Sequence, residues 1–207
     1  MTEDAVLIRQ VLQGNPTAFE QLVARYEKQV YNLCLRMVNH REDAADLTQE
    51  AFVKAWRGLQ FYKAEAAFST WLYRLTTNVC IDFLRSRKRH DALSLTTEEE
   101  EGGIQELEIS DEVPLPEEQL LYGEQKAQIR AAMAQLDEEA RTILALRVVE
   151  DLPYEQIAEV LDLKTGTVKS RLARARMKLK KILEEKGNKS VFSSSKRTER
   201  GVDAYDL

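Results

Sequence analysis

Y-E-Q-I-A-E-V-L-D-L-K-T-G-T-V-K-S-R-L-A-R-A-R, residues 154–176, carries two runs of apolar residues at helical spacing on either side of a short turn. Such a pattern is typical of two short helices that pack against each other. Counted as a twenty-residue helix-turn-helix window from Tyr154, Ala158 takes the fifth place, where only a small side chain lets the helices approach. Val168 takes the fifteenth place and is expected to point inward. The segment therefore predicts a helix-turn-helix.

The turn of this motif departs from the commonest pattern. Asp162 takes the ninth place, where Gly is frequent because the turn often needs a positive φ. Thr165 has a side-chain oxygen suited to the first position of the second helix, and we predict it as the N-cap.

Positive charge gathers on the second helix of the motif. Residues 164–181 carry eight Lys or Arg and no acidic residue, although the chain has a net charge of −5. Small residues (Gly166, Ser170, Ala173) share the side of the helix opposite the core. Cations flank this side along both of its edges, which we call the two shoulders of the helix. This arrangement suits a helix lying in the major groove of DNA. The alternative is a solvated charged helix, but such helices normally mix both signs.

Charge also divides the rest of the chain. Residues 1–90 hold thirteen basic and ten acidic residues, residues 91–125 hold twelve acidic and no basic residues, and residues 126–186 again hold thirteen and ten. We predict a helical domain over 1–90, an acidic flexible linker over 91–116, a helix-turn-helix domain over 117–186 and a disordered tail over 187–207. The fold class is all-α, with two small domains.

The first domain is predicted to be a four-helix bundle. Helices are expected at about 3–13, 16–37, 43–59 and 68–89, the second capped by Asn15 with Pro16 in its first position. Its expected core residues recur at helical spacing and include Phe19, Leu22, Leu33, Leu47, Phe52, Trp56, Phe68 and Leu72. The two cysteines, Cys34 and Cys80, are expected to be reduced core thiols.

Four strings, taken in order, resemble one protein family. They are D-A-A-D-L-T-Q-E-A-F-V-K-A-W (43–56), F-S-T-W-L-Y-R-L-T-T-N (68–78), Y-E-Q-I-A-E-V-L (154–161) and T-G-T-V-K-S-R-L-A-R-A-R (165–176). With the acidic linker between the second and the third, they closely resemble bacterial extracytoplasmic-function (ECF) sigma factors. The likeness covers residues 5–90 and 117–185.

This resemblance implies a promoter-specific transcription initiation factor that binds core RNA polymerase. The first domain would be sigma region 2, which docks on the β′ clamp helices and melts the −10 element. The second domain would be region 4, which reads the −35 element and contacts the β flap. Both domains would bind promoter DNA.

The resemblance also implies three groups of site residues. The −35 group is Thr165, Thr167, Lys169, Ser170, Arg171 and Arg174. The −10 group is Tyr62, Lys63, Glu65, Ser69, Arg74, Asn78, Arg87 and Arg89. The polymerase-binding group is Asp46, Gln49 and Glu50. Val53 is added to it because it shares their helix side opposite the core, where an exposed apolar residue suggests a partner surface. Members of the family often have Gly at the place of Ala64 and a bulky residue at that of Ala173.

The linker admits two interpretations. In the family it threads toward the active-site cleft and the RNA exit path, so its carboxylates could imitate the transcript in a basic channel. It could equally be a self-repelling spacer. The resemblance further implies an anti-sigma factor as a partner.

Other functions find little support in the sequence. No phosphate loop, nucleophile elbow or metal-ligand spacing is present, so we expect no catalytic residue, metal or cofactor. No segment is apolar enough to span a bilayer, and the N-terminus does not resemble a signal peptide, so the cytoplasm is expected. The remaining alternative is a helix-turn-helix regulator that binds its operator without polymerase.

Overall fold

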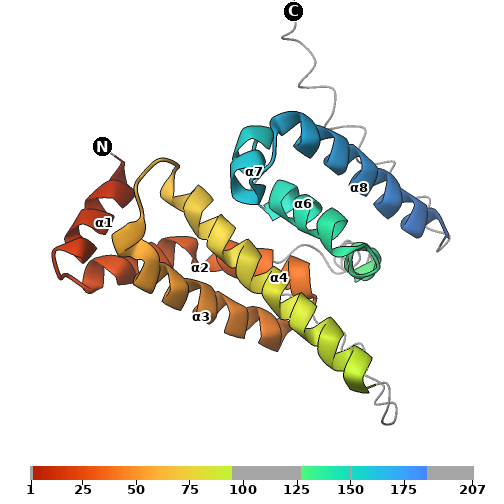
Figure 1. Ribbon diagram of the computed structural model, residues 1–207, viewed down its shortest axis with the longest axis horizontal. Helices are drawn as coiled ribbons and strands as arrows, with labels where there is room; N and C mark the ends of the chain where they lie inside the picture. The colour runs from red at the N-terminus through yellow and green to blue at the C-terminus, as the bar shows by residue number, and fades with distance from the viewer. Residues whose placement is uncertain (1, 95–126, 150, 186–207) are drawn as a thin grey trace, which may run out of the picture.

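The computed structural model of the protein describes residues 2–94, 127–149 and 151–185, and every regular element in these segments is a helix. The all-α prediction is confirmed. Figure 1 shows α1 to α4 as one group, with α6, α7 and α8 packed along one side of it. Residues 95–116 of the predicted acidic linker, residues 117–126 of the second predicted domain and the predicted tail lie outside the described residues.

The first group contains four α-helices. They are α1 (Glu3–Leu12), α2 (Thr17–Val38), α3 (Arg41–Gly58) and α4 (Phe68–Ser94), with a 3-10 turn, η1 (Leu59–Phe61), after α3. Helix α2 packs against α1, α3 and α4, and α3 packs against α4. The helix α4 continues four residues into the stretch predicted as linker, because no Gly or Pro interrupts residues 91–94.

Local signals in the sequence explain where the second and third helices begin and end. The Asn15 side chain accepts a hydrogen bond from the Thr17 N–H at 3.1 Å, and Pro16 already has a helical φ of −66°, so the predicted start is confirmed within one residue. At the other end of α2, Asn39 adopts a left-handed φ of 56°, which Asn tolerates better than most residues. His40 then caps α3 by accepting from the Asp43 N–H.

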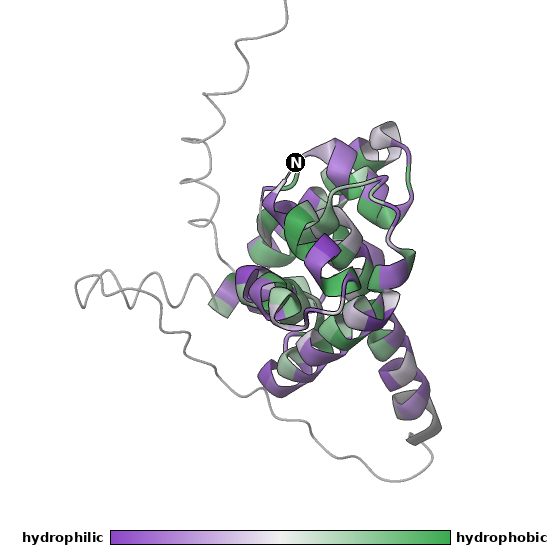
Figure 2. Ribbon diagram, turned by 90° about the vertical axis from the view of Figure 1, so that its left-hand side faces the viewer, coloured by the Kyte–Doolittle hydropathy of each residue, from purple (hydrophilic) through white to green (hydrophobic). Residues whose placement is uncertain are grey.

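The expected helical stripes form the core of the bundle. Leu22, Leu33, Met37 and Leu72 are at most 1% exposed. Figure 2 shows the hydrophobic colour on the sides of the helices that face one another. Cys34 and Cys80 are buried free thiols whose sulfur atoms lie 3.6 Å apart.

The prediction of Trp56 as a core residue is wrong. The edge of its ring contacts Phe19, with a centroid distance of 4.9 Å, but 45% of the residue is exposed. Trp56 lies at the margin of the buried stripe of α3, where a large ring extends past the neighbouring helix.

The second group begins with helical residues 127–134 and continues with α6 (Glu138–Val149), α7 (Tyr154–Leu161) and α8 (Thr165–Glu185). Asp137 caps α6 by accepting from the Ala140 N–H at 2.9 Å. Helices α7 and α8 form the predicted helix-turn-helix, with Ala158 and Val168 buried between them.

The turn of this motif confirms one expectation and corrects another. Asp162 has a φ of 53°, so the turn takes the positive φ that Gly would favour, with an acidic residue in its place. Thr165 is already inside α8: the carbonyl of Lys164 accepts from the N–H groups of Thr167 and Val168, so the N-cap position belongs to Lys164.

The two groups are packed against each other. Helix α2 contacts α6, and α4 contacts α7. Buried residues of both groups form one continuous apolar cluster. The sequence predicted two domains and a tether, and it did not predict this contact.

Truncation of a buried leucine should lower the free energy of unfolding more than truncation of an exposed one. We expect Leu22→Ala, at a 0% exposed site in α2, to lower the free energy of unfolding by about 2–5 kcal/mol, because it removes buried methyl groups and leaves a cavity. Leu12→Ala, at a 55% exposed site, should cost less than about 1 kcal/mol. Urea unfolding followed by circular dichroism measures both, and equal losses would contradict the assigned core.

Candidate nucleic-acid interface

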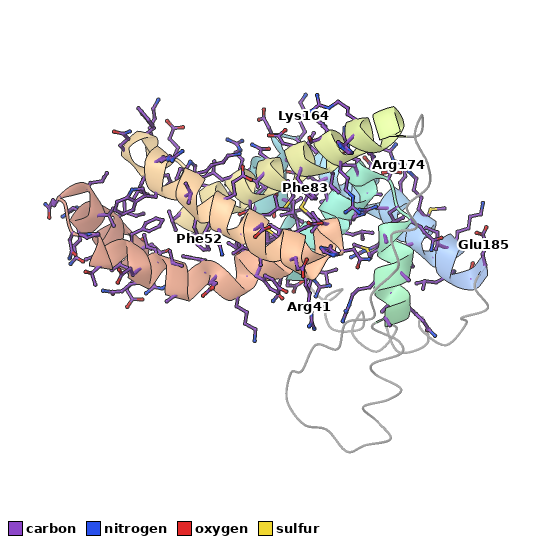
Figure 3. The ribbon with its side chains drawn as sticks, turned by 90° about the horizontal axis from the view of Figure 1, so that it is seen from below. Arg41, Phe52, Phe83, Lys164, Arg174 and Glu185 are labelled. Carbon is purple, nitrogen blue, oxygen red and sulfur yellow. The ribbon has the colours of Figure 1, made fainter. Side chains whose placement is uncertain are left out.

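Helix α8 presents a narrow polar surface to solvent. Its inner side buries Val168, Leu172 and Ala175, each at most 1% exposed. Ser170 and Ala173 are exposed on the outer side, as the sequence predicted. Figure 3 marks Lys164 just before this helix, Arg174 near its middle and Glu185 at its end.

One shoulder of α8 faces carboxylates from the start of α6. Arg171 Nε lies 3.0 Å from Glu139 Oε1, and Lys178 pairs with Asp137. The Lys178 ammonium and the Ala140 N–H hold the pKa of Asp137 below its usual value. The exposed Arg174 lies between these pairs, lining a small hollow with them. These contacts fix the shoulder in place and offset part of its charge, which the sequence did not reveal.

The other shoulder carries cations with fewer carboxylates nearby. The Lys169 ammonium stands 5.9 Å from the centre of the Tyr154 ring, and the Arg147 guanidinium stands 5.7 Å from the same ring. Tyr154 therefore links α6, α7 and α8 through its ring. Among the described residues, Arg176 has no carboxylate within ion-pair distance. The surface of α8 is thus more positive on this shoulder.

A second polar surface lies at the loop before α4. The Tyr62 hydroxyl donates to the Ala66 carbonyl at 2.7 Å, and its ring packs against Phe68 and Trp71. Burial raises the pKa of Tyr62. Ala64 adopts a positive φ of 56°, which is strained for a residue with a Cβ. The loop therefore has a fixed shape that leaves Lys63 and Glu65 exposed.

The structure divides the predicted −10 residues into two clusters. Tyr62, Lys63 and Glu65 lie beside the first turns of α4, which carry Ser69 and Arg74, and Asn78 follows one turn later. The exposed Arg87 lies about 20 Å beyond Arg74 and about 13 Å beyond Asn78 along the helix axis, at a rise of about 1.5 Å per residue, and the exposed Arg89 lies farther still. Arg87 pairs there with Asp43 at 3.4 Å. The two clusters can contact one strand only as separate points along its length.

The outer side of α3 is a third candidate surface. Asp46, Gln49, Glu50 and Val53 are all exposed, with Val53 at 47%. Trp56, on the same side as Val53, and Phe61, which is 74% exposed in η1, add apolar area that the sequence reading missed. Exposed large apolar side chains among polar ones on one helix side, here Val53 and Trp56, are consistent with a protein-binding surface.

Gly58, between Trp56 and Phe61, allows a close approach of two elements. A Cβ at this position would lie 3.3 Å from the Trp71 ring, so only Gly lets the end of α3 come this near to α4 without displacing the ring. The apolar residues of η1 thereby lie close to the loop before α4.

An open groove of about 720 Å³ separates the loop before α4 from the helix-turn-helix. Its walls come from residues 65–74 on one side and 155–165 on the other. Arg74 crosses it: the guanidinium donates to the Glu159 carbonyl at 2.8 Å and lies 4.0 Å from the Asp162 carboxylate. The groove places predicted −10 residues directly opposite the turn of the helix-turn-helix.

Other kinds of site find no support in the described part of the chain. Residues 2–94, 127–149 and 151–185 contain no group of three or more His, Cys, Asp or Glu side chains that could hold a metal ion. No helix within these ranges is long and apolar enough to cross a membrane.

Comparison with known proteins identifies the family. The model of Sigma-70 region 2 matches residues 22–90, and that of Sigma-70, region 4 matches residues 126–179. The RNA polymerase sigma-H factor of Pseudomonas aeruginosa is 36% identical over 182 residues, which cover 88% of this chain and 94% of the relative. The ECF RNA polymerase sigma factor SigW of Bacillus subtilis is 34% identical, over 86% of this chain and 95% of the relative. The chain belongs to the ECF sigma factor family.

Further relatives and solved structures agree with this assignment. The ECF RNA polymerase sigma-E factor of Escherichia coli K12 is 37% identical, over 84% of this sigma factor and 90% of the relative. CnrH, solved in complex with the cytosolic domain of CnrY, superposes with a TM-score of 0.63 at 26% identity, over 88% of this chain and 97% of that one. The sigma factor RpoE of Bartonella quintana, solved with the anti-sigma factor NepR, shares the fold with a TM-score of 0.61.

The ion pair between α6 and α8 leads to a prediction about DNA affinity. Glu139→Gln should tighten binding to a nonspecific duplex about two- to fivefold, because Arg171 keeps its charge and loses a carboxylate that competes with phosphate. Fluorescence anisotropy at fixed salt measures the effect, since such affinities depend steeply on salt.

Glu20→Gln is the matched control, because it removes the same charge from an exposed site on α2, outside the three candidate surfaces, without breaking an ion pair given by the structure. An equal gain in both variants would show that net charge, and not the pair with Arg171, governs binding.

Proposed function

We propose that this sigma factor directs core RNA polymerase to a small set of promoters by reading a −35 element with α8 and a melted −10 strand with the loop before α4 and α4 itself. The observation that carries the proposal is the presence of two separate basic surfaces, on α4 and on α8, in one sigma-family chain. We infer the domain boundaries from this division: residues 1–90 act as region 2, residues 91–116 as the linker and residues 117–186 as region 4.

In the −35 step, α8 lies in the major groove with its small outer residues against the bases. Arg171 and Arg174 project from the shoulder beside α6, where Glu139 limits the freedom of Arg171. An Arg can donate two hydrogen bonds to a guanine, which gives sequence preference. Lys169 and Ser170 complete the reading surface, and Thr165 and Thr167 contact the backbone near the helix start.

In the −10 step, a base leaves the stack and enters the loop at residues 62–67. Removal of a base from the stack costs a few kcal/mol, which binding to polymerase and to the loop must offset. The rigid Tyr62 and the exposed Lys63 and Glu65 form the receiving edge, and Ser69, Arg74 and Asn78 hold the neighbouring nucleotides. Arg87 and Arg89 bind phosphates farther along the strand, which positions the DNA without specifying its sequence.

The polymerase contacts are assigned to the exposed outer side of α3 and to region 4. Asp46, Gln49, Glu50 and Val53 dock on the β′ clamp helices, and Trp56 extends this surface. Region 4 contacts the β flap. Catalysis belongs to the polymerase, the site of action is the cytoplasm, and an anti-sigma factor is proposed as a further partner.

Binding to core polymerase distinguishes a sigma factor from a regulator that binds its operator without polymerase. We expect the full chain to co-elute with purified core RNA polymerase in size-exclusion chromatography and to bind promoter DNA tightly only in that complex. A chain that fails to bind core and binds a duplex tightly by itself would instead be a helix-turn-helix regulator.

Two arginines on α8 should differ in their effect on promoter choice. Arg174→Ala should lower the preference for a matched over a mismatched −35 site by about tenfold, because one good base contact contributes about 1–3 kcal/mol of discrimination. Arg176→Ala should weaken binding to both sites alike, since a phosphate contact carries no sequence information. Competition binding of the reconstituted holoenzyme measures both ratios, and equal ratios would refute the division of roles.

A further inference from the structure

The first turn of α1 carries a carboxylate that two consecutive residues of α2 bind. The Arg25 guanidinium donates to Asp4 Oδ1 at 2.5 Å, and the Tyr26 hydroxyl donates to Asp4 Oδ2 at 2.6 Å. Both oxygens of the carboxylate are thereby occupied, and the Asp4 side chain is only 18% exposed. The neighbouring Glu3 also pairs with Arg25, at 2.8 Å, but its side chain is 82% exposed. Asp4 therefore fixes α1 on α2 at a defined point.

The Tyr26 ring leads from this carboxylate to the loop before α4. Its centroid lies 5.6 Å from that of Phe68, the first residue of α4, which is buried. Phe68 in turn meets the Tyr62 ring edge to face at 5.9 Å and the Trp71 ring at 5.6 Å. Tyr62 closes the loop by donating to the Ala66 carbonyl. A continuous chain of contacts thus runs from the first turn of α1 to the loop that is proposed to receive a base.

Two further observations show that Asp4 lies beside this loop. Burial raises the pKa of Tyr62, and the nearby Asp4 carboxylate raises it further. Helix α1 also contacts η1, which leads directly into the loop. Figure 1 shows α1 and the loop before α4 at the same end of the first group. The carboxylate and the loop therefore belong to one local structure.

The loop needs support from outside because its backbone is strained. Ala64 holds a positive φ of 56°, a conformation that a residue with a Cβ keeps only where the surrounding contacts impose it. The tip of the loop supplies few such contacts, since Lys63, Ala64 and Glu65 are all exposed. The strain must therefore be held by the rings at the base of the loop and by the groups that fix those rings.

We propose that Asp4 is a positioning residue for capture of the −10 base: through Tyr26 and Phe68 it holds the loop at residues 62–67 in the shape that receives the base. The inference rests on the proposed function, because it concerns the same loop. Asp4 itself contacts no DNA in this role. Its charge is matched by Arg25, so it adds little repulsion toward the phosphates of an incoming strand.

A simpler role for Asp4 would be to fasten α1 and nothing more. A carboxylate in the first turn of a helix interacts favourably with the helix dipole, and Glu3 and Asp4 both stand there. Of these two carboxylates it is Asp4 that accepts from Tyr26, and the Tyr26 ring carries the contact on to Phe68. The two roles differ in their consequences. Loss of a fastening lowers stability, whereas loss of positioning lowers the preference for one base.

Selection from a pool of randomised single-stranded oligonucleotides tests the positioning role. The pool is sequenced before and after binding to holoenzyme reconstituted from core RNA polymerase and the full chain, with core alone as background. We expect the wild type to prefer one base at the captured position. Asp4→Asn keeps the shape of the side chain and loses its charge, so it should lower this preference about three- to tenfold, because bonds to a charged group are the strong ones. Preferences at neighbouring positions should stay unchanged.

Tyr26→Phe is the second variant, and Glu3→Gln is the matched control. Tyr26→Phe keeps the ring against Phe68 and removes only the hydroxyl, so it should fold and should lower the same preference. The double variant Asp4→Asn, Tyr26→Phe should lose no more than the stronger single variant, since both act through one hydrogen bond. Glu3→Gln removes the same charge one residue away, from a side chain in water, and should keep the wild-type preference.

Thermal unfolding of the same variants distinguishes positioning from fastening. If Asp4→Asn and Tyr26→Phe lower the melting temperature but leave the base preference at its wild-type value, Asp4 only fastens α1 and the inference is wrong. An equal loss of preference in Glu3→Gln would show that charge alone, and not the bond to Tyr26, is responsible, and would also refute it. A wild-type holoenzyme that prefers no base at any position would overturn the proposed function, and this inference with it.

Discussion

The burial of α6 on two sides is the constraint on which the arrangement of the molecule depends. One side of the helix holds the helix-turn-helix together, and the other rests on α2. A helix in this position cannot leave the first domain without exposing apolar surface, and exposed apolar surface favours any partner that covers it again. Arg141 fixes the orientation of α6 on α2, because a planar guanidinium with several donors fits only where several carbonyls converge.

Carboxylates lie close to the proposed DNA-binding surfaces of this protein. An acidic protein that binds DNA must keep carboxylates away from its reading surface, and this chain does so only in part. Asp137 and Glu139 hold one shoulder of α8, whereas Asp162 and Glu159 lie beside Arg74. Arg171 and Arg74, which the proposed function assigns to DNA, already have a carboxylate and a carbonyl as partners, so in that function DNA binding would exchange one partner for another.

Local features of the chain were predictable from sequence because local physics determines them. Helical periodicity identified the buried stripes of α2 and α4, and Asn15 and Pro16 marked the start of α2 within one residue. The helix-turn-helix followed from the spacing of Ala158 and Val168, and the positive φ at Asp162 followed from its place in the turn.

The features that the sequence did not predict depend on contacts between distant segments of the chain. Trp56 satisfies the helical pattern, yet its burial depends on how far the neighbouring helix reaches. Thr165 has the chemistry of an N-cap, but the preceding Lys164 already accepts the first helical hydrogen bonds. The contact of α6 with α2 has no sequence signature. Arg74 and Arg141 bond to backbone carbonyls, which are present at every residue, and the pair of Arg85 with Glu138 joins residues that lie far apart in the chain.

Promoter opening by the reconstituted enzyme tests most directly whether these two basic surfaces act on one stretch of DNA. Permanganate footprinting of genomic promoter fragments, with core RNA polymerase and this protein, reports unpaired thymines. We expect reactive thymines near the −10 position of a small set of promoters, present only when both proteins are added. An absence of reactive thymines on every fragment, from a complex shown to contain both proteins, would contradict it.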